Sequence, residues 1–477
     1  MTETIKQALN DKAWARWLAL ILVASMMFFA YMFVDVMSPL QSLVQTQRGW
    51  TPVAFGNYAG AEYILNVFGF LILAGIILDK MGVRFTGTLS ASVMVIGAFI
   101  KLYGLSDAFQ GTALDQWLSS WWTDMPGSAK MAAFGFMIFG CGCEMAGITV
   151  SKALAKWFEG KEMALAMGLE MAIARVGVFA IFSISPRLAD WGGTPSVVTP
   201  VAFCAALLCI GLLCFIVFTF MDSRLDKELG AANSAAEGSD EEFKLADVAF
   251  IFRSRLFWIV AMLCVLYYSA IFPFQRYAAN MLQCNLGITE TQASDIFRWF
   301  PIGAAALTPF LGYFLDKKGK GATMLILGAI LMIVCHLTFA FIVPATKSDV
   351  ITYSAIVVLG ISFSLVPAAL WPSVPKIMDK RFLGSAYSLI FWVQNIGLAF
   401  VPIIIGKVLL ASNPGIDDPL AYNYTAPMCV FASLGGLALL FGIWLKILNA
   451  KNGYGLEEPN IKSDAEVLAA EDQAAEG

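Results

Sequence analysis

The chain has 477 residues, of which 59% are hydrophobic and only 14% are charged, whereas soluble globular domains carry about 25% charged residues. Its net charge of -4 and its pI near 5.3 leave no basic surface for nucleic acid. The composition therefore excludes a nucleic-acid-binding protein and a soluble enzyme, and it is typical of a protein embedded in a lipid bilayer.

Twelve apolar segments follow one another along the chain. Each is long enough for a membrane helix, which needs about 20 mostly apolar residues. The first segment is too long for the apolar part of a cleavable signal peptide, so it is predicted to span the membrane. The predicted spans cover residues 14–43, 52–79, 85–106, 129–156, 162–187, 197–221, 255–284, 291–315, 322–344, 350–372, 383–411 and 426–448. This pattern predicts an all-α membrane protein.

The predicted spans fall into two groups of six, separated by a polar stretch rich in Ala, Ser, Glu and Asp. We expect a cytoplasmic N-terminal tail, a first six-helix bundle, a flexible or partly helical cytoplasmic linker, a second six-helix bundle and an acidic, disordered cytoplasmic tail. These units are predicted to cover residues 1–13, 14–221, 222–254, 255–448 and 449–477.

The distribution of Lys and Arg predicts the orientation, because cytoplasmic loops carry an excess of these residues. If both termini are cytoplasmic, most loop and tail cations fall inside, and the outside segments hold only Arg48, Lys130, Arg187 and Lys347. If one span were missed, every later loop would be assigned to the opposite side of the membrane, and the excess of Lys and Arg on one side would disappear. We therefore expect twelve spans with both ends of the chain in the cytoplasm.

A short pattern occurs once in each group of six spans, directly after the second and the eighth span. Both copies read G-x-x-x-D-K-x-G with a basic residue close behind. The first copy contains Gly75, Asp79, Lys80, Gly82 and Arg84, and the second contains Gly312, Asp316, Lys317, Gly319 and Lys320. Internal duplication marks transporter folds. The first glycine of each copy is expected to permit close helix approach, and the second is expected to form a tight turn that presents cations to the lipid headgroups.

This pattern resembles the loop signature of the major facilitator superfamily. The resemblance implies that fold, in which two pseudo-symmetric six-helix bundles rock about a midplane site, with the two loops as a cytoplasmic latch. A narrower similarity, to the branch that contains the lysosomal dipeptide carriers, is carried by Gly140 to Glu144, Trp157 to Gly168, Ala174 to Gly177, Tyr267 to Phe274, Ala369 to Pro375 and Gln394 to Ala399. The branch implies facilitated transport of short peptides, that is, uniport without a driving ion.

Ionisable residues inside the predicted spans are candidates for function, because a charge near the bilayer centre costs at least about 2.5–3.5 kcal/mol. Glu144 lies on the fourth span and Arg175 lies mid-way along the fifth. If both face one cavity, Glu144 can hold an ammonium group and Arg175 can clamp a carboxylate through two parallel hydrogen bonds. The resemblance implies the same roles for a Glu and an Arg in these blocks. The alternative is a structural salt bridge between the two helices.

Further polar and aromatic residues inside the spans are candidates for the same cavity, although each is as common between packed helices as at a ligand. These candidates are Tyr31, Asp35, Glu62, Tyr267, Tyr268, Arg276, Arg298, Trp371, Gln394 and Asn395. Lys101 and Lys407 are expected to snorkel toward the helix ends. The carboxyl groups of the predicted cavity can titrate, so coupling to protons stays open.

Three other classes of protein compete with a peptide carrier. An organic-anion or phosphate-ester carrier of the same superfamily would use Arg175, Arg276 and Arg298, and a solute sensor would bind its ligand without transport. An enzyme is not expected, because the chain has no nucleotide-binding glycine loop and no zinc-protease motif, and its single histidine, His336, lies in apolar surroundings. No cofactor is expected, and the nine cysteines show no paired spacing for a metal site.

Location and partners are predicted from the short polar segments. The N-terminal tail shows no acidic dileucine sorting signal, and the short termini and compact loops favour a bacterial inner membrane over a lysosome. We expect a monomer in the lipid bilayer that binds a small-molecule substrate and no nucleic acid.

Overall fold

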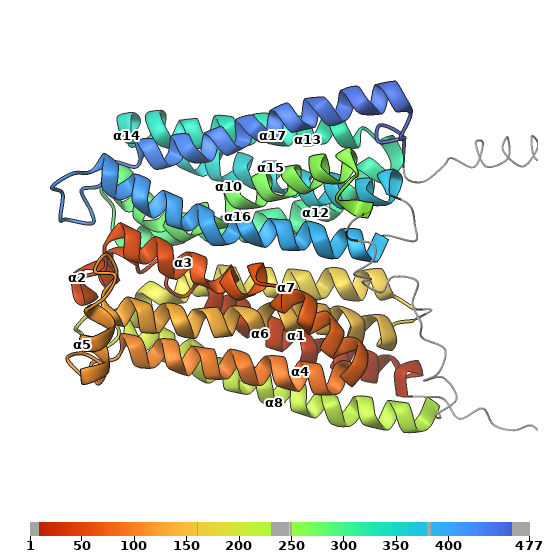
Figure 1. Cartoon of the computed structure of the whole chain (residues 1–477), viewed down its shortest axis with the longest axis horizontal. Helices are drawn as coiled ribbons and strands as arrows, with labels where there is room; N and C mark the ends of the chain where they lie inside the picture. The colour runs from red at the N-terminus through yellow and green to blue at the C-terminus, as the bar shows by residue number, and fades with distance from the viewer. Residues whose placement is uncertain (1–8, 160, 230–247, 249, 379–382, 460–477) are drawn as a thin grey trace, which may run out of the picture.

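Helices that run side by side build the whole described part of the molecule. The computed structural model describes residues 9–159, 161–229, 248, 250–378 and 383–459, and all regular elements within these ranges are helices. Ten of these helices are long and apolar enough to cross a membrane. They form two layers, one from each half of the chain (Figure 1).

The first layer contains the first six spans, with short helices at their ends. A 3-10 turn, η1 (Leu9–Asp11), precedes α1 (Ala13–Asp35), and α2 (Gln41–Arg48) follows it. The second span joins α3 (Pro52–Val67) to the first part of α4 (Phe70–Leu105), and the rest of α4 is the third span. The layer is completed by α5 (Ala113–Ser119), α6 (Gly127–Trp157), α7 (Met163–Ala189) and α8 (Val198–Leu229). We call the end of the molecule that carries η1 the inner end and the opposite end, with α2 and α5, the outer end.

The second layer repeats this arrangement. The seventh span is α10 (Arg255–Leu286), and the short outer helix α11 (Glu290–Phe297) leads into the eighth, α12 (Trp299–Lys318). The ninth span joins α13 (Gly321–Leu337), a π-helical turn η2 (Thr338–Ile342) and α14 (Val343–Thr346). The last three spans are α15 (Asp349–Ile377), α16 (Leu383–Ser412) and α17 (Thr425–Asn452). The predicted all-α architecture of two six-helix bundles is confirmed.

The predicted linker and tails lie partly outside the described residues. The helix α8 continues to Leu229, past residue 222, where the linker is predicted to begin, so the first polar residues extend the sixth span toward the inner end. Residues 230–247 and 249 of the linker, residues 1–8 of the N-terminal tail and residues 460–477 of the C-terminal tail are not among the described residues.

Two glycines divide the second and third spans. The backbone has a φ of 94° at Gly69 and a φ of 76° at Gly82, and side-chain-bearing residues rarely adopt such values. The break at Gly69 leaves α3 with 16 residues, too few to cross the hydrocarbon core alone. The turn at Gly82 separates the second span from the third at the inner end, as the repeated pattern predicts.

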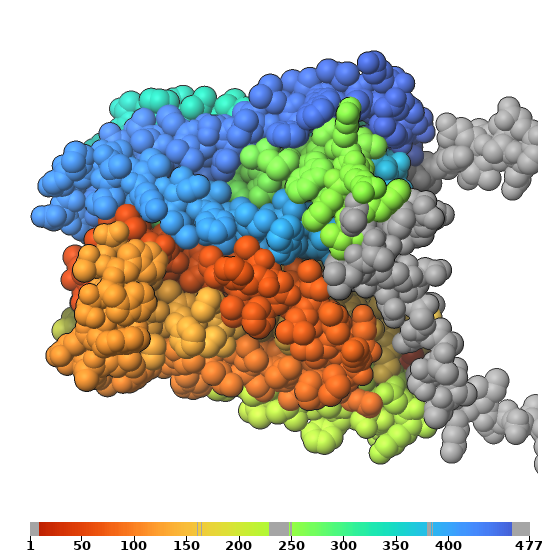
Figure 2. All heavy atoms as spheres, in the orientation of Figure 1, coloured from red at the N-terminus to blue at the C-terminus, as the bar shows by residue number. Residues whose placement is uncertain are grey.

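The two layers meet closely where α3 packs against α16 (Figures 1 and 2). Gly56 and Gly60 of α3 face the backbone oxygens of Pro402 and Ala399, and Gly406 of α16 faces the start of α3. A Cβ atom at any of these three glycines would overlap the opposite backbone. Glycine therefore lets helices of opposite layers touch. This contact lies on the outer half of α16.

Lys101 and His336 lie in the core, and for each the sequence gives an expectation that can be compared with the structure. The expectation that Lys101 snorkels is wrong: its side chain is fully buried, and its Nζ lies 4.2 Å from the ring centroid of Phe33 and 4.4 Å from that of Phe136. The faces of these rings attract the ammonium group in place of water. His336 lies in the core, as expected, where its ring stacks on Phe431 at 5.3 Å.

Candidate functional site

Glu144 and Arg175 lie near the middle of two consecutive helices of the first layer. Glu144 is on α6 and Arg175 is on α7, and both side chains are half-buried. Neither side chain forms a hydrogen bond or an ion pair within the part of the chain that the structure describes. The structural salt bridge considered above is therefore not formed in this conformation, and both charged groups are available to another partner.

Tyr31 of α1 lies near both charged groups. Its phenol is within electrostatic reach of Glu144 and of Arg175. The guanidinium carbon of Arg175 is 5.9 Å from the ring centroid of Tyr31, 5.3 Å from that of Phe272 and 5.7 Å from that of Phe363. Ring faces attract a guanidinium without using its N–H groups as a carboxylate would. The three rings thus hold Arg175 and leave its donors for an anion.

Glycines let the helices around this pair approach one another. Gly140 of α6 lies against the backbone of Glu62, and Gly177 of α7 lies against the backbone of Phe28. A Cβ atom at either glycine would crowd the neighbouring carbonyl oxygen. Because Glu144 follows Gly140 by one helical turn, the close contact between α6 and α3 sets the depth of its carboxyl group.

The second layer contributes an aromatic wall. Tyr268 and Phe272 of α10 stack with their centroids 5.6 Å apart, and Phe363 of α15 meets them edge-on at 5.9 Å and 5.6 Å. The Nε1 of Trp371 donates a hydrogen bond to the Tyr268 hydroxyl at 3.2 Å. Two rings of this wall also face Arg175. We call this group of residues, with Glu144 and Tyr31, the central site: its charges come from the first layer and most of its rings come from the second.

Arg276 of α10 joins the two layers through a buried ion cluster. Its Nη1 lies 3.1 Å from Asp35 Oδ1, and its Nη2 lies 2.5 Å from Glu62 Oε2. The amide of Gln275 donates to Asp35 Oδ2 at 2.6 Å, and the Ser38 hydroxyl donates to Asp35 Oδ1 at 3.0 Å. The side chains of Arg276, Asp35 and Glu62 are only 7%, 2% and 5% exposed. Two carboxylates of the first layer therefore rely on a guanidinium of the second.

Arg298 lies at the outer end, in a second ion cluster between the layers. Its Nη1 is 2.9 Å from Asp295 Oδ1 and 3.2 Å from the hydroxyl of Ser183 on α7. Arg187, also on α7, binds both oxygens of Asp295, at 3.1 Å and 2.7 Å. Asp295 and Arg298 belong to the second layer, so this cluster closes the outer end.

The three arginines suggested for a doubly charged anion do not converge. Arg276 is paired with two carboxylates, and Arg298 is paired with Asp295. Of these three, Arg175 alone has no ion pair within the described residues. The arrangement fits one carboxylate better than a doubly charged anion.

A further contact at the outer end includes a carboxyl group with a shifted pKa. The hydroxyl of Ser42, on α2, lies 3.2 Å from Gln283 Oε1 and 3.2 Å from Glu290 Oε2. Burial raises the pKa of Glu290 to about 8, and the hydrogen bond from Ser42 opposes this rise. The closed outer end thus favours the protonated form of Glu290, which precedes the eighth span.

Ion pairs at the inner end hold the first copy of the repeated pattern. Asp79 accepts a hydrogen bond from Lys152 of α6 at 2.8 Å. Arg84 lies 3.0 Å from Asp226 of α8. Lys80 is exposed. These pairs tie the turn between the second and third spans to two other helices of the same layer.

Within each copy of the repeated pattern, the second glycine forms a turn, whereas the first glycine makes no close contact. Gly82 and Gly319 both have a positive φ, 76° and 69°, as the predicted turns require. The expectation for the first glycine of each copy is wrong, because nothing lies within 4 Å of a Cβ atom built on Gly75 or Gly312. Both face open space in the structure, so neither mediates a close helix contact. In the second copy, Lys317 lies over the ring of Tyr313, with Nζ 4.7 Å from its centroid.

Three other candidates occupy packing positions in the second layer. The hydroxyl of Tyr267 donates to the backbone oxygen of Leu325 and so joins α10 to α13. Gln394 accepts a weak hydrogen bond from the thiol of Cys264 at 3.3 Å. Asn395 donates at 3.0 Å to the carbonyl one turn before it on α16. All three side chains are buried, and these bonds stabilise the layer itself.

Several contacts in and around the candidate site carry no clear signal in the sequence. Phe272 and Phe363 lie nearest to Arg175 in the second layer, yet each is an ordinary apolar residue of a span. Arg187 and Asp295 are polar residues near span ends, where such residues are common. Their pairing depends on the contact between layers. Among the described residues, no group of three or more His, Cys, Asp and Glu side chains is placed to hold a metal ion.

Comparisons with known proteins agree with this architecture. A family model described as Major Facilitator Superfamily matches residues 24–283 and residues 274–465. The lysosomal dipeptide transporter MFSD1 of Danio rerio is 28% identical over 408 residues, which cover 83% of this chain and 80% of the relative. The transporter of that name from Homo sapiens is 26% identical over 456 residues, which cover 92% of this chain and 88% of the relative.

The fold also matches solved structures. A bacterial homologue of the human lysosomal transporter Spinster, in an inward-facing and unoccupied conformation, has a TM-score of 0.68. The match covers 94% of this chain and 99% of that chain at 13% sequence identity. At this identity the likeness concerns the fold alone.

Proposed function

The chain belongs to the Major Facilitator Superfamily, and from this premise we propose that it is a secondary transporter that moves small zwitterionic solutes, above all dipeptides and short peptides, by alternating access. That it is a membrane transporter and not an enzyme follows from the family itself. The cargo class is supported by the relatives, which are named lysosomal dipeptide transporters.

In this proposal Glu144 binds the amino group of the cargo and Arg175 binds its carboxylate. One observation carries it: both groups are half-buried within electrostatic reach of the Tyr31 phenol, and neither has an ion pair within the described residues. A carboxylate can accept two parallel hydrogen bonds from a guanidinium, which gives direction as well as affinity. The rings around Arg175 restrict its side chain before cargo arrives, which lowers the entropy lost on binding.

The two opposite charges suit a zwitterion for an energetic reason. Moving an isolated ion from water into a low-dielectric site is very costly unless a partner compensates for the lost hydration. A peptide carries an ammonium group at one end and a carboxylate at the other, so both ends need a partner at once. Glu144 and Arg175 supply one partner each, and the aromatic wall supplies contact for the body of the peptide.

Alternating access would open and close the two ends of the molecule in turn. The conformation described here has an outer end closed by the two ion clusters and by the contact between α3 and α16. We propose that the loops with Asp79 and Asp316 latch the opposite, cytoplasmic end when the layers rock, and that transport is uniport. We place both chain termini in the cytoplasm, with the linker and tail segments beside them.

The proposal places the protein in a membrane but assigns no particular cellular compartment. The chain is a multi-pass membrane protein. The relatives named above are lysosomal transporters, which does not support the bacterial inner membrane that the short termini and loops favour.

A thermal-shift screen of the purified protein tests this function. A ligand present at 100 times its Kd adds about 2.7 kcal/mol to the stability of the folded state, which raises the melting temperature. We expect dipeptides to stabilise the native protein and to lose this effect in Glu144→Gln and in Arg175→Ala. Arg224→Ala is the matched control, because Arg224 is 70% exposed at the inner end of α8, and it is expected to respond like the native protein. Stabilisation by dicarboxylates alone would contradict the proposal.

A further inference from the structure

The chain turns back on itself after the last span. Gly453 and Gly455 have φ values of 66° and 72°, and residues 453–459, which we call the clasp, then cross the inner end of the second layer. Leu456 of the clasp is buried, with 2% of its surface exposed. Its carbonyl oxygen accepts a hydrogen bond from the backbone N–H of Gly321 at 2.9 Å. The clasp is therefore packed against the start of α13.

Glu457 fixes the clasp to that helix. Its two carboxylate oxygens accept hydrogen bonds from the backbone N–H and the hydroxyl of Thr323, both at 2.8 Å, and its carbonyl accepts one from the N–H of Lys320 at 3.0 Å. The first turn of a helix has unpaired N–H groups and a positive dipole end, so a carboxylate there is favourable. Glu457 thus acts as an acidic cap supplied from a distant part of the chain.

The clasp also explains the second glycine of the second repeated pattern. A Cβ atom on Gly319 would overlap the backbone of Glu457 and Glu458. The corresponding glycine of the first copy, Gly82, faces open space, with nothing within 4 Å. Both glycines form turns, but Gly319 has the added role of letting the clasp pass. The two copies of the pattern therefore differ in what covers them.

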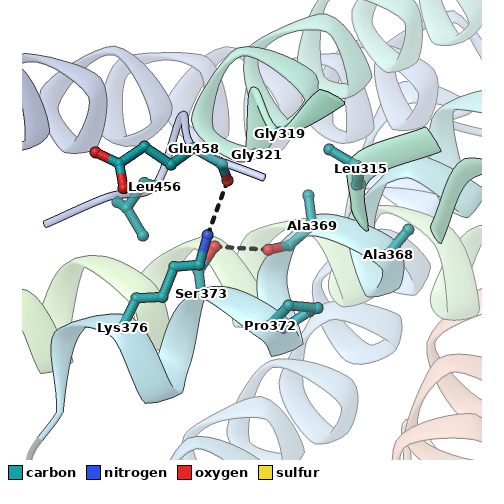
Figure 3. A pocket seen from close by; sticks show the side chains of 10 residues that line it. All are labelled: Leu315, Gly319, Gly321, Ala368, Ala369, Pro372, Ser373, Lys376, Leu456 and Glu458. Carbon is teal, nitrogen blue, oxygen red and sulfur yellow. Dashed lines mark hydrogen bonds between the residues drawn. The ribbon is translucent and has the colours of Figure 1, made fainter. Parts of the chain in front are cut away.

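The clasp contacts the inner part of α15, where prolines reduce the number of helical hydrogen bonds. Prolines at 367, 372 and 375 lie within the inner part of this helix, and each removes a helical hydrogen bond. Directly after them, Lys376 donates hydrogen bonds to the carbonyl oxygens of Gly455 and Glu458 at 2.9 Å and 3.0 Å. Figure 3 shows the small cavity that remains between the clasp and this part of α15. The helix end has space beside it, and Lys376 joins it to the clasp.

This weak helix end carries a residue of the central site. Trp371 directly precedes one of the prolines and donates its hydrogen bond to Tyr268, and its carbonyl accepts one from the Tyr387 hydroxyl at 3.2 Å. Because Lys376 lies little more than one helical turn further on, a shift of the helix end would move the indole. We propose that the clasp is a positioning element of the central site: through Lys376 it holds the inner end of α15 and so fixes Trp371 in the aromatic wall. That Trp371 meets cargo rests on the proposed function.

Hydrogen–deuterium exchange of the purified protein tests the mechanical part without any cargo. A chain that ends at Asn452 lacks the clasp, whereas a chain that ends at Pro459 keeps it and is the matched control. We expect the amides of residues 368–377 to exchange at least fivefold faster in the shorter chain and at the native rate in the control. In the full-length chain, Lys376→Met is expected to show the same faster exchange. Lys376→Arg keeps the hydrogen-bond donors, so its exchange rates are expected to stay close to the native rates. Native exchange rates in both the shorter chain and Lys376→Met would overturn the proposal.

Uptake by proteoliposomes tests the positioning part. For a dipeptide that the native protein transports, we expect Lys376→Met to raise the KM at least threefold and to leave the maximal rate within about twofold, because the site is disturbed while the two layers still move. Arg224→Ala is the control, since Arg224 is 70% exposed on α8 of the other layer, and it should leave both values unchanged. Faster exchange with an unchanged KM would also overturn the proposal. If the native protein takes up no dipeptide, the proposed function fails, whereas the exchange result still decides whether the clasp holds α15.

Discussion

Replacing Arg276 with methionine removes the cation that pairs with Asp35 and Glu62 across the two layers. Methionine is flexible and fills irregular space well, so the main loss is the charge and its hydrogen bonds. The two carboxylates are only 2% and 5% exposed, and they would be left as buried charges. Removing one partner of a buried pair costs about 3–5 kcal/mol. We expect a loss at the upper end of that range, because one substitution breaks two pairs.

Two further variants separate the effect of charge from that of side-chain shape. Arg298→Met breaks a pair whose side chains are 26% and 28% exposed, and such partly exposed pairs contribute about 0–1 kcal/mol. A triple variant that combines Arg276→Met with Asp35→Asn and Glu62→Gln removes the stranded charges, so it should regain most of the lost stability.

Thermal unfolding in lipid nanodiscs, followed by intrinsic fluorescence, compares these variants under one condition. The expected order of melting temperature is native, then Arg298→Met and the triple variant close below it, and Arg276→Met clearly lowest. A melting temperature of Arg276→Met equal to that of Arg298→Met would show that Asp35 and Glu62 do not depend on Arg276 for their stability. So would a triple variant that is no more stable than Arg276→Met.

Three other residues give predictions of the same kind. Gly60→Val is expected to abolish most dipeptide uptake by proteoliposomes, because its side chain would overlap the carbonyl of Ala399 and keep α3 from α16; uptake above half the native rate would contradict this. The pH on the outer side is expected to act through Glu290, whose pKa of about 8 in the closed outer end should fall toward 4.5 when the group meets water. Closure then takes up a proton, so it is favoured at low pH and loses this contribution as the pH rises through 8. Labelling of a cysteine introduced at the outer end becomes faster with pH in either background, because the thiolate is the reactive form. The labelling rate in the native background divided by the rate with Glu290→Gln should therefore rise from about pH 6 to about pH 8.5. Asp79→Asn is expected to lower stability by less than about 1 kcal/mol, because Asp79 and Lys152 are 47% and 44% exposed; a larger loss in thermal unfolding would make the loop a structural element and not a latch.

Much of the fold can be predicted from the sequence, because membrane helices can be recognised by their length, their hydropathy and the charges that flank them. The repeated pattern adds the division into two halves, and the resemblance to the major facilitator superfamily is confirmed by the family match. The break at Gly69 could not be predicted in the same way. A single glycine in an apolar run is common in membrane helices, so nothing local marks the end of α3.

The candidate site shows where sequence reasoning stops. Buried charges such as Asp35 and Arg276 stand out in apolar spans, but their pairing could not be foreseen, because it depends on a contact between the two halves of the chain. The prediction for Lys101 is wrong for a related reason: the rings of Phe33 and Phe136 that surround its ammonium group come from other helices. Phe363 faces Arg175 yet looks like any other core residue. Polarity marks candidates, and only the packing of helices selects among them.

In the proposed function, Glu144 holds the amino group of a peptide and Arg175 holds its carboxylate. Isothermal titration of one dipeptide, its N-acetyl derivative and its C-terminal amide into the native protein, Glu144→Gln and Arg175→Ala tests this most directly. We predict that N-acetylation weakens binding to the native protein at least tenfold, or about 1.4 kcal/mol, and has little further effect in Glu144→Gln, and that amidation behaves in the same way toward Arg175→Ala. An equal loss on N-acetylation in the native protein and in Glu144→Gln would show that Glu144 does not bind the amino group.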